Sequence, residues 1–271
     1  SSLQRKQTIN MVNHRQIIFF DKIKGILTVE SGISINDVIN RIIPQGFFMP
    51  VTPGSKFVTI GGMVASNVHG KNHHLDGGFS NFIISFVLLS NNGKKKTCSP
   101  SKNKDLFYAT IGGMGLTGII LEVKFSLLKI ETNLINQKII PTKDLKETMK
   151  VFSENSKMKY SVAWIDCLAR KKKLGRSIIF LGEHLTSEQL KKSRSNYEYS
   201  KSDRNILSIP FQMPSIILNN FTIRIFNNLY FNKQIKSKKQ NCVHYDKFFY
   251  DLDSIKNWNK IYGKNGFLQY Q

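Results

Sequence analysis

The sequence predicts an α+β fold, and three observations lead to this prediction. Strand and helix signals alternate irregularly in the first half, with a hairpin signal in place of regular βαβ units. After about Ile130 the pattern changes to period-two alternation, which is typical of an amphipathic sheet. The length of 271 residues and the 41% hydrophobic content suffice for two modest domains with packed cores. We therefore expect domains at residues 1–129 and 130–271.

The first half carries strand signals at residues 25–30, 47–51, 83–89, 94–98 and 119–127. Ser34, with Asp37 three residues later, predicts a capped helix that ends before Gly46. The Asn-Gly pair at 92–93 predicts a hairpin between two of the strands. Residues 105–110 predict a short helix.

The second half begins with an amphipathic strand at residues 158–164, which we expect to pair with 177–181. Asp253 is typical of a helix N-cap, with apolar residues on one face and Gly263 as the stop. The other expectations are a helix from residue 186, a connection at 199–215, a helix at 216–231, a mobile polar segment at 232–240 and a strand at 266–271.

The charge is strongly positive, with 40 Lys plus Arg against 18 Asp plus Glu and a net charge of +22. The basic runs at 94–96, 170–173 and 233–239 match no zinc-finger, RRM or basic-zipper pattern, so specific nucleic-acid recognition is disfavoured. An anionic membrane face or a phosphorylated substrate fits the same charge.

Composition also bears on location. Three cysteines are too few and too far apart for a disulfide framework, and we expect them to be reduced thiols. No apolar run approaches the roughly 20 residues of a bilayer span, and the N-terminus has no signal-peptide pattern. We expect a chain that is cytoplasmic or peripheral to the inner membrane. Its two ends suggest a piece of a longer protein.

The segment at residues 53–74 concentrates glycine, with Gly54, Gly61, Gly62 and Gly70. Glycines allow close backbone approach to a ligand, and successive free N–H groups form concave anion sites. A cofactor with a diphosphate is one interpretation of this segment. A pair of tight turns around a short helix is the other.

A second glycine segment lies at residues 111–118, where Gly113, Gly115 and Gly118 match the G-x-G-x-x-G fingerprint. That fingerprint requires a strand before it and a helix after it. Here a helix is expected before the segment and a strand after it. We therefore reject a Rossmann-type NAD site.

The histidines at 69, 73 and 74 raise the question of a metal site. His69 and His73 have the spacing of a zinc helix, but Gly70 stands where the glutamate base would be, and the residues between favour no helix. We expect no metal here. These histidines and Lys71 are better interpreted as lining a polar cleft for a phosphate or a flavin ring, with a solvated loop as the alternative.

Taken together, these motifs resemble a known family. The blocks at 53–62, 69–74, 79–81, 111–120 and 266–271 resemble the FAD-linked oxidases of the vanillyl-alcohol oxidase superfamily. Those at 69–74 and 269–271 are most similar to the subgroup that acts on polyprenyl-phosphate pentoses. The resemblance implies an FAD-binding PCMH-type domain and a mainly antiparallel-sheet substrate domain. Both would be incomplete, because the family's first phosphate loop would precede Ser1 and its later lysine and cysteine would follow Gln271.

The resemblance also implies roles for individual residues. His69 and Lys71 would be catalytic, and Gln269 and Gln271 would bind substrate. The residues implied at the FAD are Gly54, Thr59, Ile60, Gly61, Gly62, Ser66, Asn67, Val68, His69 and Ile120.

The implied reaction is oxidation of the 2′-hydroxyl of a polyprenyl-phosphate pentose to a 2′-keto sugar, by hydride transfer to flavin N5. It would form half of a 2′-epimerisation in cell-wall or surface polysaccharide synthesis, with a separate NADH-dependent keto-reductase as the pathway partner. This chain alone would bind FAD poorly and turn over little or nothing. A sugar-lactone oxidase of the same superfamily and a basic binding module without chemistry remain as alternatives. The basic segment at 233–239 would contact membrane or lipid-linked substrate, or be a solvated loop.

Overall fold

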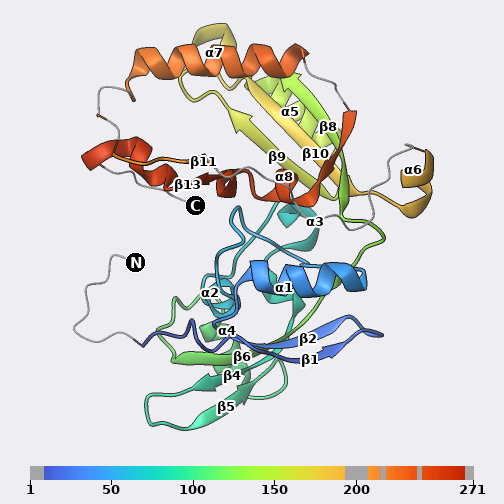
Figure 1. Cartoon of the computed structure of the whole chain (residues 1–271), viewed down its shortest axis with the longest axis vertical. Coiled ribbons are helices and arrows are strands. Elements are labelled where there is room, and N and C mark those ends of the chain that lie inside the picture. The colour runs from blue at the N-terminus through green and yellow to red at the C-terminus, as the bar shows by residue number, and fades with distance from the viewer. Residues whose placement is uncertain (1–8, 193–206, 213, 215–217, 237–239, 266–271) are drawn as a thin grey trace. The chain divides into compact units, whose positions relative to one another are not determined.

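The computed structural model describes residues 9–192, 207–212, 214, 218–236 and 240–265 (Figure 1). It divides into two compact units, unit 1 (Ser1–Glu131) and unit 2 (Thr132–Gln271). Both units mix helices with antiparallel sheets, which confirms the expected α+β class. Among the helices described, none is long and apolar enough to cross a membrane.

Unit 1 is built on a five-stranded antiparallel sheet in the order β1-β2-β6-β4-β5. Alternate residues of the central strands, such as Leu27, Val29 and Val123, have no exposed surface and form the core. The strands are β1 (Ile17–Asp21), β2 (Ile26–Glu30), β4 (Ile83–Leu89), β5 (Lys95–Cys98) and β6 (Ile119–Ser126).

A strand was expected at residues 47–51, and this prediction is too long. Only β3 (Phe47–Phe48) pairs, with β7 (Leu128–Lys129). Pro50 has no N–H to donate to a ladder, so the pairing stops before it.

The capping signal of unit 1 is confirmed. Helix α1 (Ile35–Ile42) begins at Ser34, whose hydroxyl accepts a hydrogen bond from the Asp37 N–H at 3.1 Å. The short turn η1 (Ile43–Gln45) then ends at Gly46, which has φ of 80°. The remaining helical segments are α2 (Ile60–Ala65), α3 (His73–Asp76), η2 (Phe79–Phe82) and α4 (Lys104–Thr110).

Unit 2 contains a four-stranded antiparallel sheet in the order β12-β8-β10-β9. The predicted pairing of the period-two strand is confirmed, with Trp164 opposite Ile178. The strands are β8 (Leu134–Thr142), β9 (Tyr160–Ile165), β10 (Ser177–His184) and β12 (Gln240–His244). The helical segments are α5 (Leu145–Glu154), η3 (Lys171–Lys173), α6 (Ser187–Lys192), α7 (Asn220–Lys236) and α8 (Tyr245–Phe249).

Helices α5 and α7 cover opposite faces of this sheet (Figure 1). Phe231 of α7 packs on Ile139 and Ile178, whereas Thr148 of α5 shares a 2.7 Å hydrogen bond with Thr142. Ile139 and Thr142 are three residues apart in β8, so their side chains point to opposite faces.

The segment at 232–240 was expected to be mobile, and for residues 232–236 this is wrong because they continue α7. Lysine, glutamine and asparagine are tolerated in helices, and Lys233 and Lys236 stand in the last turn, where the helix dipole favours cations. Gln240 already belongs to β12, and residues 237–239 lie outside the described part.

The helix expected from Asp253 is also wrong. Residues 251–265 instead form two 3₁₀ segments, η5 (Asp251–Ser254) and η6 (Trp258–Asn265), around β13 (Ile255–Lys256). Ile255 pairs in parallel with Leu207 of β11 (Leu207–Ser208). Ile255 therefore belongs to a strand and not to the apolar face of the expected helix. β11 falls within the expected connection at 199–215, whereas 193–206, 215–217 and the expected strand at 266–271 lie outside the described residues.

Candidate cofactor site

The two glycine segments of unit 1 lie against each other at the end of α2. The N–H of Gly112 donates to the Val64 carbonyl at 3.0 Å, and the N–H of Met114 donates to the Ala65 carbonyl at 2.9 Å. Gly112 also passes close to Asn67, because a Cβ built on Gly112 would lie 3.5 Å from the Asn67 Cβ. The fold therefore brings together residues of the two segments that are at least 45 positions apart in sequence.

The first glycine segment also folds back on its own beginning. A Cβ on Gly70 would lie 2.6 Å from the Thr52 carbonyl oxygen, so only glycine fits where these two backbones cross. Next to it, the side chain of Asn72 donates a 2.8 Å hydrogen bond to the Pro50 carbonyl. Residues 52–54, 66–71 and 112–115 are thus neighbours in space, and we call them together the glycine surface.

Parts of the glycine surface are bare backbone. Apart from their own chain neighbours, no residue in the described part of the chain has an atom within 4 Å of the Cβ position of Gly54 or of Gly115. The chain neighbours of Gly115, Met114 and Leu116, have apolar side chains that are 72% and 81% exposed. Open backbone beside exposed apolar side chains can accommodate a large ligand that has a polar chain and a flat ring.

The expectation of free N–H groups at the start of α2 is wrong. Ile60 donates to the Ile33 carbonyl at 2.9 Å, Gly61 donates to the Ser31 carbonyl at 2.7 Å, and Gly62 donates to the Thr59 hydroxyl at 3.2 Å. These donors are already used within the protein, so an anion would have to bind elsewhere on the glycine surface.

Gly61 therefore has a packing role. Its Cβ would lie 2.8 Å from the Cβ of Ser31, at the end of β2, so its absence lets α2 approach the sheet. The chain then leaves α2 through exposed Ser66 and through Asn67, which has φ of +41°. The Asn67 side chain accepts a 3.1 Å hydrogen bond from the Ser80 N–H, and Val68 donates to the Met63 carbonyl at 3.0 Å.

The histidine-rich block stands at one end of the glycine surface. The rings of His69 and His73 are exposed and meet edge to face, with centroids 5.3 Å apart and an angle of 71°. Lys71 lies between them in sequence and is half-buried. Helix α3 begins only at His73, so the two histidines do not share a helix as a zinc helix requires. The described residues contain no group of three or more side chains suited to a metal ion.

Asn72 is the residue that the sequence reasoning missed. It is 1% exposed, and its amide donates to the Pro50 carbonyl and to the carboxylate of Asp76. It therefore ties the histidine block to the loop before Gly54. A polar residue between two histidines gave no signal that it would be buried.

The structure places the remaining site residues as follows. Ile120 lies in β6, 7% exposed and opposite Leu88, so packing in the core accounts for its side chain. Gln269 and Gln271 lie outside the described residues. The rejection of a Rossmann site is confirmed, because the segment at 111–118 follows helix α4 and precedes strand β6.

Comparisons with known proteins bear on the same region. Residues 2–99 match the family described as "FAD binding domain". Decaprenylphosphoryl-β-D-ribose oxidase of Mycolicibacterium smegmatis is 34% identical over 268 residues, which are 97% of this chain and 58% of the relative. Delta(24)-sterol reductase of Rattus norvegicus is 25% identical over 146 residues, 54% of this chain and 28% of the relative. D-lactate dehydrogenase of Anaerostipes hadrus is 28% identical over 144 residues, 51% of this chain and 30% of the relative.

The chain thus spans little more than half the length of the first of these relatives and less of the other two. The family match includes Thr52 to Lys71, where most of the glycine surface lies. The open glycines, the polar groups of Ser66 and Asn67 and the cation of Lys71 fit a dinucleotide with a flat ring system. Residues 2–99 form an FAD-binding domain, and 97% of the chain is similar to decaprenylphosphoryl-β-D-ribose oxidase.

Proposed function

We propose that this chain binds FAD on the glycine surface and serves in oxidising the 2′-hydroxyl of a polyprenyl-phosphate pentose. The observation that carries the proposal is the 34% identity over 97% of the chain with decaprenylphosphoryl-β-D-ribose oxidase. The glycine surface supports it independently, because it offers open backbone beside polar and apolar side chains. The 2′-keto product would suit an NADH-dependent keto-reductase, and the pair would perform a 2′-epimerisation in cell-wall or surface polysaccharide synthesis.

The oxidation removes a hydride from the C2′ carbon and a proton from its hydroxyl, and it leaves a carbonyl group. The chemistry that FAD supplies when bound is acceptance of that hydride at flavin N5. The chain's own residues have the remaining tasks of binding the cofactor, orienting the sugar and taking up the proton.

Individual residues suit these tasks. Gly54 and Gly115 leave room for a bulky group, and Ser66 and Asn67 are exposed polar residues of the glycine surface. The exposed imidazole of His69 can accept the hydroxyl proton. The ammonium group of Lys71 can neutralise a phosphate. By resemblance, Gln269 and Gln271 would contact the sugar, and Thr59, Gly62 and Val68 would line the cofactor. Ile60 and Ile120 are buried and Gly61 packs on Ser31, so these three residues would support the cofactor surface through packing.

The cofactor part of the proposal is tested by titrating the purified chain with FAD and following the flavin fluorescence. Gly54→Leu adds a side chain at a position where, apart from the chain neighbours, no described residue has an atom within 4 Å of the Cβ. We therefore expect a normal fold but an affinity for FAD that is about tenfold weaker or more. Asn91→Leu, at an exposed turn, is the matched control and should bind FAD normally. If both variants bind FAD equally well, FAD does not bind on the glycine surface.

The substrate part needs a separate experiment. The FAD-loaded protein is mixed under anaerobic conditions with a polyprenyl-phosphate ribose or with a soluble aldonolactone, and the flavin absorbance is followed. Loss of absorbance with the lipid-linked sugar is the expected result. Loss with the lactone alone would establish the sugar-lactone oxidase instead, and loss with neither would leave a chain that binds FAD without this chemistry.

A further inference from the structure

Helix α7 carries apolar side chains on two faces. Its inner face holds Phe231, which is 9% exposed and packs on the sheet of unit 2. Its outer face holds large apolar side chains in solvent. These are Phe221 (71% exposed), Ile225 (45%), Phe226 (60%) and Leu229 (65%). Large apolar side chains that gather on one exposed helix face mark a contact surface, so we expect the outer face of α7 to be covered by a partner.

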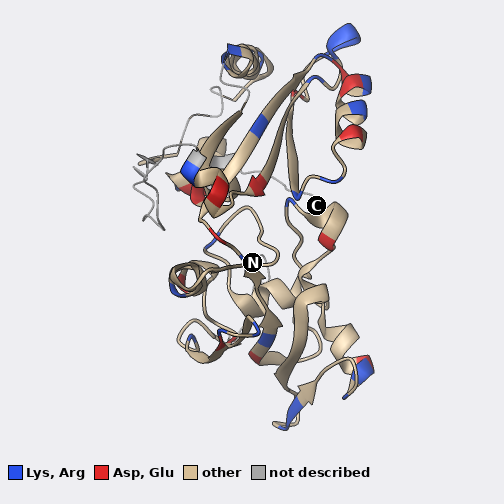
Figure 2. Ribbon diagram, turned by 90° about the vertical axis from the view of Figure 1, so that its right-hand side faces the viewer, with Lys and Arg blue, Asp and Glu red and all other residues tan. Residues whose placement is uncertain are grey.

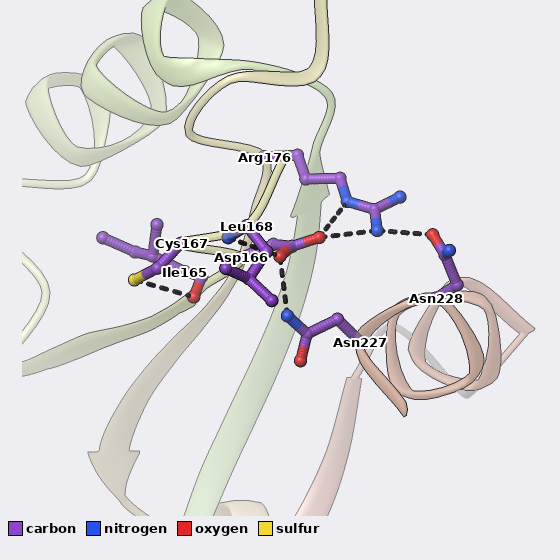
Figure 3. Close-up of polar contacts among 7 residues, drawn as sticks. All are labelled: Ile165, Asp166, Cys167, Leu168, Arg176, Asn227 and Asn228. Carbon is purple, nitrogen blue, oxygen red and sulfur yellow. Dashed lines mark hydrogen bonds and ion pairs between the residues drawn. The ribbon is translucent and has the colours of Figure 1, made fainter. Parts of the chain in front are cut away.

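The helix is held in this orientation by a buried polar network (Figure 3). Arg176 and Asp166 form an ion pair whose side chains are 9% and 3% exposed. The Asn227 amide donates to Asp166 at 2.6 Å, and the Asn228 side-chain oxygen accepts from Arg176 at 2.6 Å. The Arg176 guanidinium also lies over the Phe231 ring, 4.8 Å from its centroid. Because these contacts hold the inner face on the sheet, α7 cannot rotate about its axis to bury the side chains of its outer face.

The outer face also carries cations in a regular order. Residues 221, 225, 229 and 233 are spaced four apart, so three apolar side chains and then Lys233 form one row along the helix. Lys236 continues this face by one more turn. Residues 220–236 contain no Asp or Glu, and no acidic residue is coloured on this helix in Figure 2.

We propose that the outer face of α7 docks on the surface of an anionic phospholipid membrane, with its apolar side chains among the lipid chains and its lysines at the headgroup phosphates. Aromatic and aliphatic side chains beside lysines are the composition of helices that lie in the membrane interface. The net charge of +22 attracts the chain to such a surface. A second copy of the chain is a less suitable partner. If two α7 helices met through their outer faces, their lysines would face each other, and neither helix has a carboxylate to neutralise them.

The docking goes beyond the proposed function and does not need it. Only the link to a lipid-borne substrate rests on the proposed function, because a polyprenyl-phosphate sugar is held in a membrane. The two can fail separately, since docking is measured without FAD and without sugar.

The test is sedimentation of the whole chain with vesicles of phosphatidylcholine alone or of phosphatidylcholine with phosphatidylglycerol. We expect binding to the anionic vesicles that weakens with added salt, and much weaker binding to the neutral ones. The double variant Phe221→Ser/Leu229→Ser should lower the partition coefficient about tenfold or more. Lys233→Glu/Lys236→Glu should lower binding to the anionic vesicles only. Circular dichroism of all variants should be that of the parent chain.

Helix α5 provides the matched controls. Met149 is 65% exposed, and Lys150 stands on the same helix next to acidic residues. Met149→Ser and Lys150→Glu should leave vesicle binding unchanged. The proposal is overturned if the parent chain binds no anionic vesicles, or if the α5 variants lose as much binding as the α7 variants. It is also overturned if sedimentation velocity shows self-association that the Phe221→Ser/Leu229→Ser variant abolishes while vesicle binding persists.

Discussion

Arg176 donates two hydrogen bonds to one carboxylate oxygen of Asp166, from Nε at 2.8 Å and from Nη2 at 2.6 Å. Burial opposes ionisation of Asp166, but the hydrogen bonds from Arg176 and Asn227 outweigh it and hold the pKa of this carboxyl below its usual value. The pair connects the ends of β9 and β10 and, through Asn227, the helix α7. Its effect should therefore be seen in the stability of unit 2.

Asp166→Ala would leave the Arg176 guanidinium buried without its carboxylate. Breaking a buried pair in this way costs about 3–5 kcal/mol. The free energy of unfolding in urea, followed by the fluorescence of Trp164 and Trp258, should fall by that amount. The control is Lys150→Ala, which removes an exposed pair with Glu154 at 3.7 Å and should cost less than about 1 kcal/mol. Equal effects of the two variants would show that the Asp166 network does not hold α7.

His184 predicts a dependence of unit 2 stability on pH. Burial in the core lowers the pKa of its imidazole to about 4, against the usual value of 6.5. Between these values the unfolded chain binds a proton that the folded protein does not, so the free energy of unfolding should fall as the pH drops from about 6.5 to about 4. The loss amounts to roughly 3 kcal/mol at 1.36 kcal/mol for each pKa unit.

The measurement for His184 is urea unfolding at a series of pH values from 4 to 7. His184→Gln removes the titrating group, so the pH dependence of this variant should be flatter by the amount that His184 contributes. His74→Gln, at an exposed position, should keep the slope of the parent chain. A slope that is the same in all three proteins would assign the pH dependence to other groups.

Gly61 and Gly54 predict opposite results for the same substitution. Gly61→Ala places a Cβ 2.8 Å from that of Ser31, and such overpacking should destabilise unit 1 by about 1–3 kcal/mol. Gly54→Ala adds a methyl group to open space and should leave the stability unchanged. Thermal unfolding of the two variants separates the packing glycine from the ligand-facing one. If both are neutral, α2 can shift away from β2 at little cost.

The sequence predicted correctly those elements of the fold that are determined by residues close together in the chain. The cap at Ser34 and the hairpin at residues 92–93 need only neighbouring residues, and both are correct. Strand β8 was missed because Pro141 interrupts its pattern. The structure tolerates this proline because β12 pairs only with Leu134–Lys138, so no ladder hydrogen bond to β12 is lost at Pro141.

The candidate site shows the same limit. The glycine segments were recognisable, since glycine marks close approach of backbones wherever it occurs. Which glycine serves packing and which faces open space depends on neighbours distant in sequence, such as Ser31 for Gly61. The sequence could not predict the hydrogen-bond network of Asp166 for the same reason, because Asn227, which donates to Asp166, is 61 residues away in the chain.

His69 and His73 give the prediction that bears most directly on chemistry. If His69 takes the proton from the sugar hydroxyl, His69→Gln should slow flavin reduction by the lipid-linked sugar by about 100-fold or more, because general bases contribute factors of this size. The fluorescence titration should still show FAD binding, since the open glycines are untouched. His73→Gln removes only the edge-to-face contact that orients the His69 ring, so its effect should be smaller, about tenfold. His74→Gln is the control, because it makes the same exchange at the exposed histidine next to His73, and it should leave the rate unchanged. If the His69 variant keeps the full rate, the proton goes to another group and the catalytic assignment of His69 is wrong.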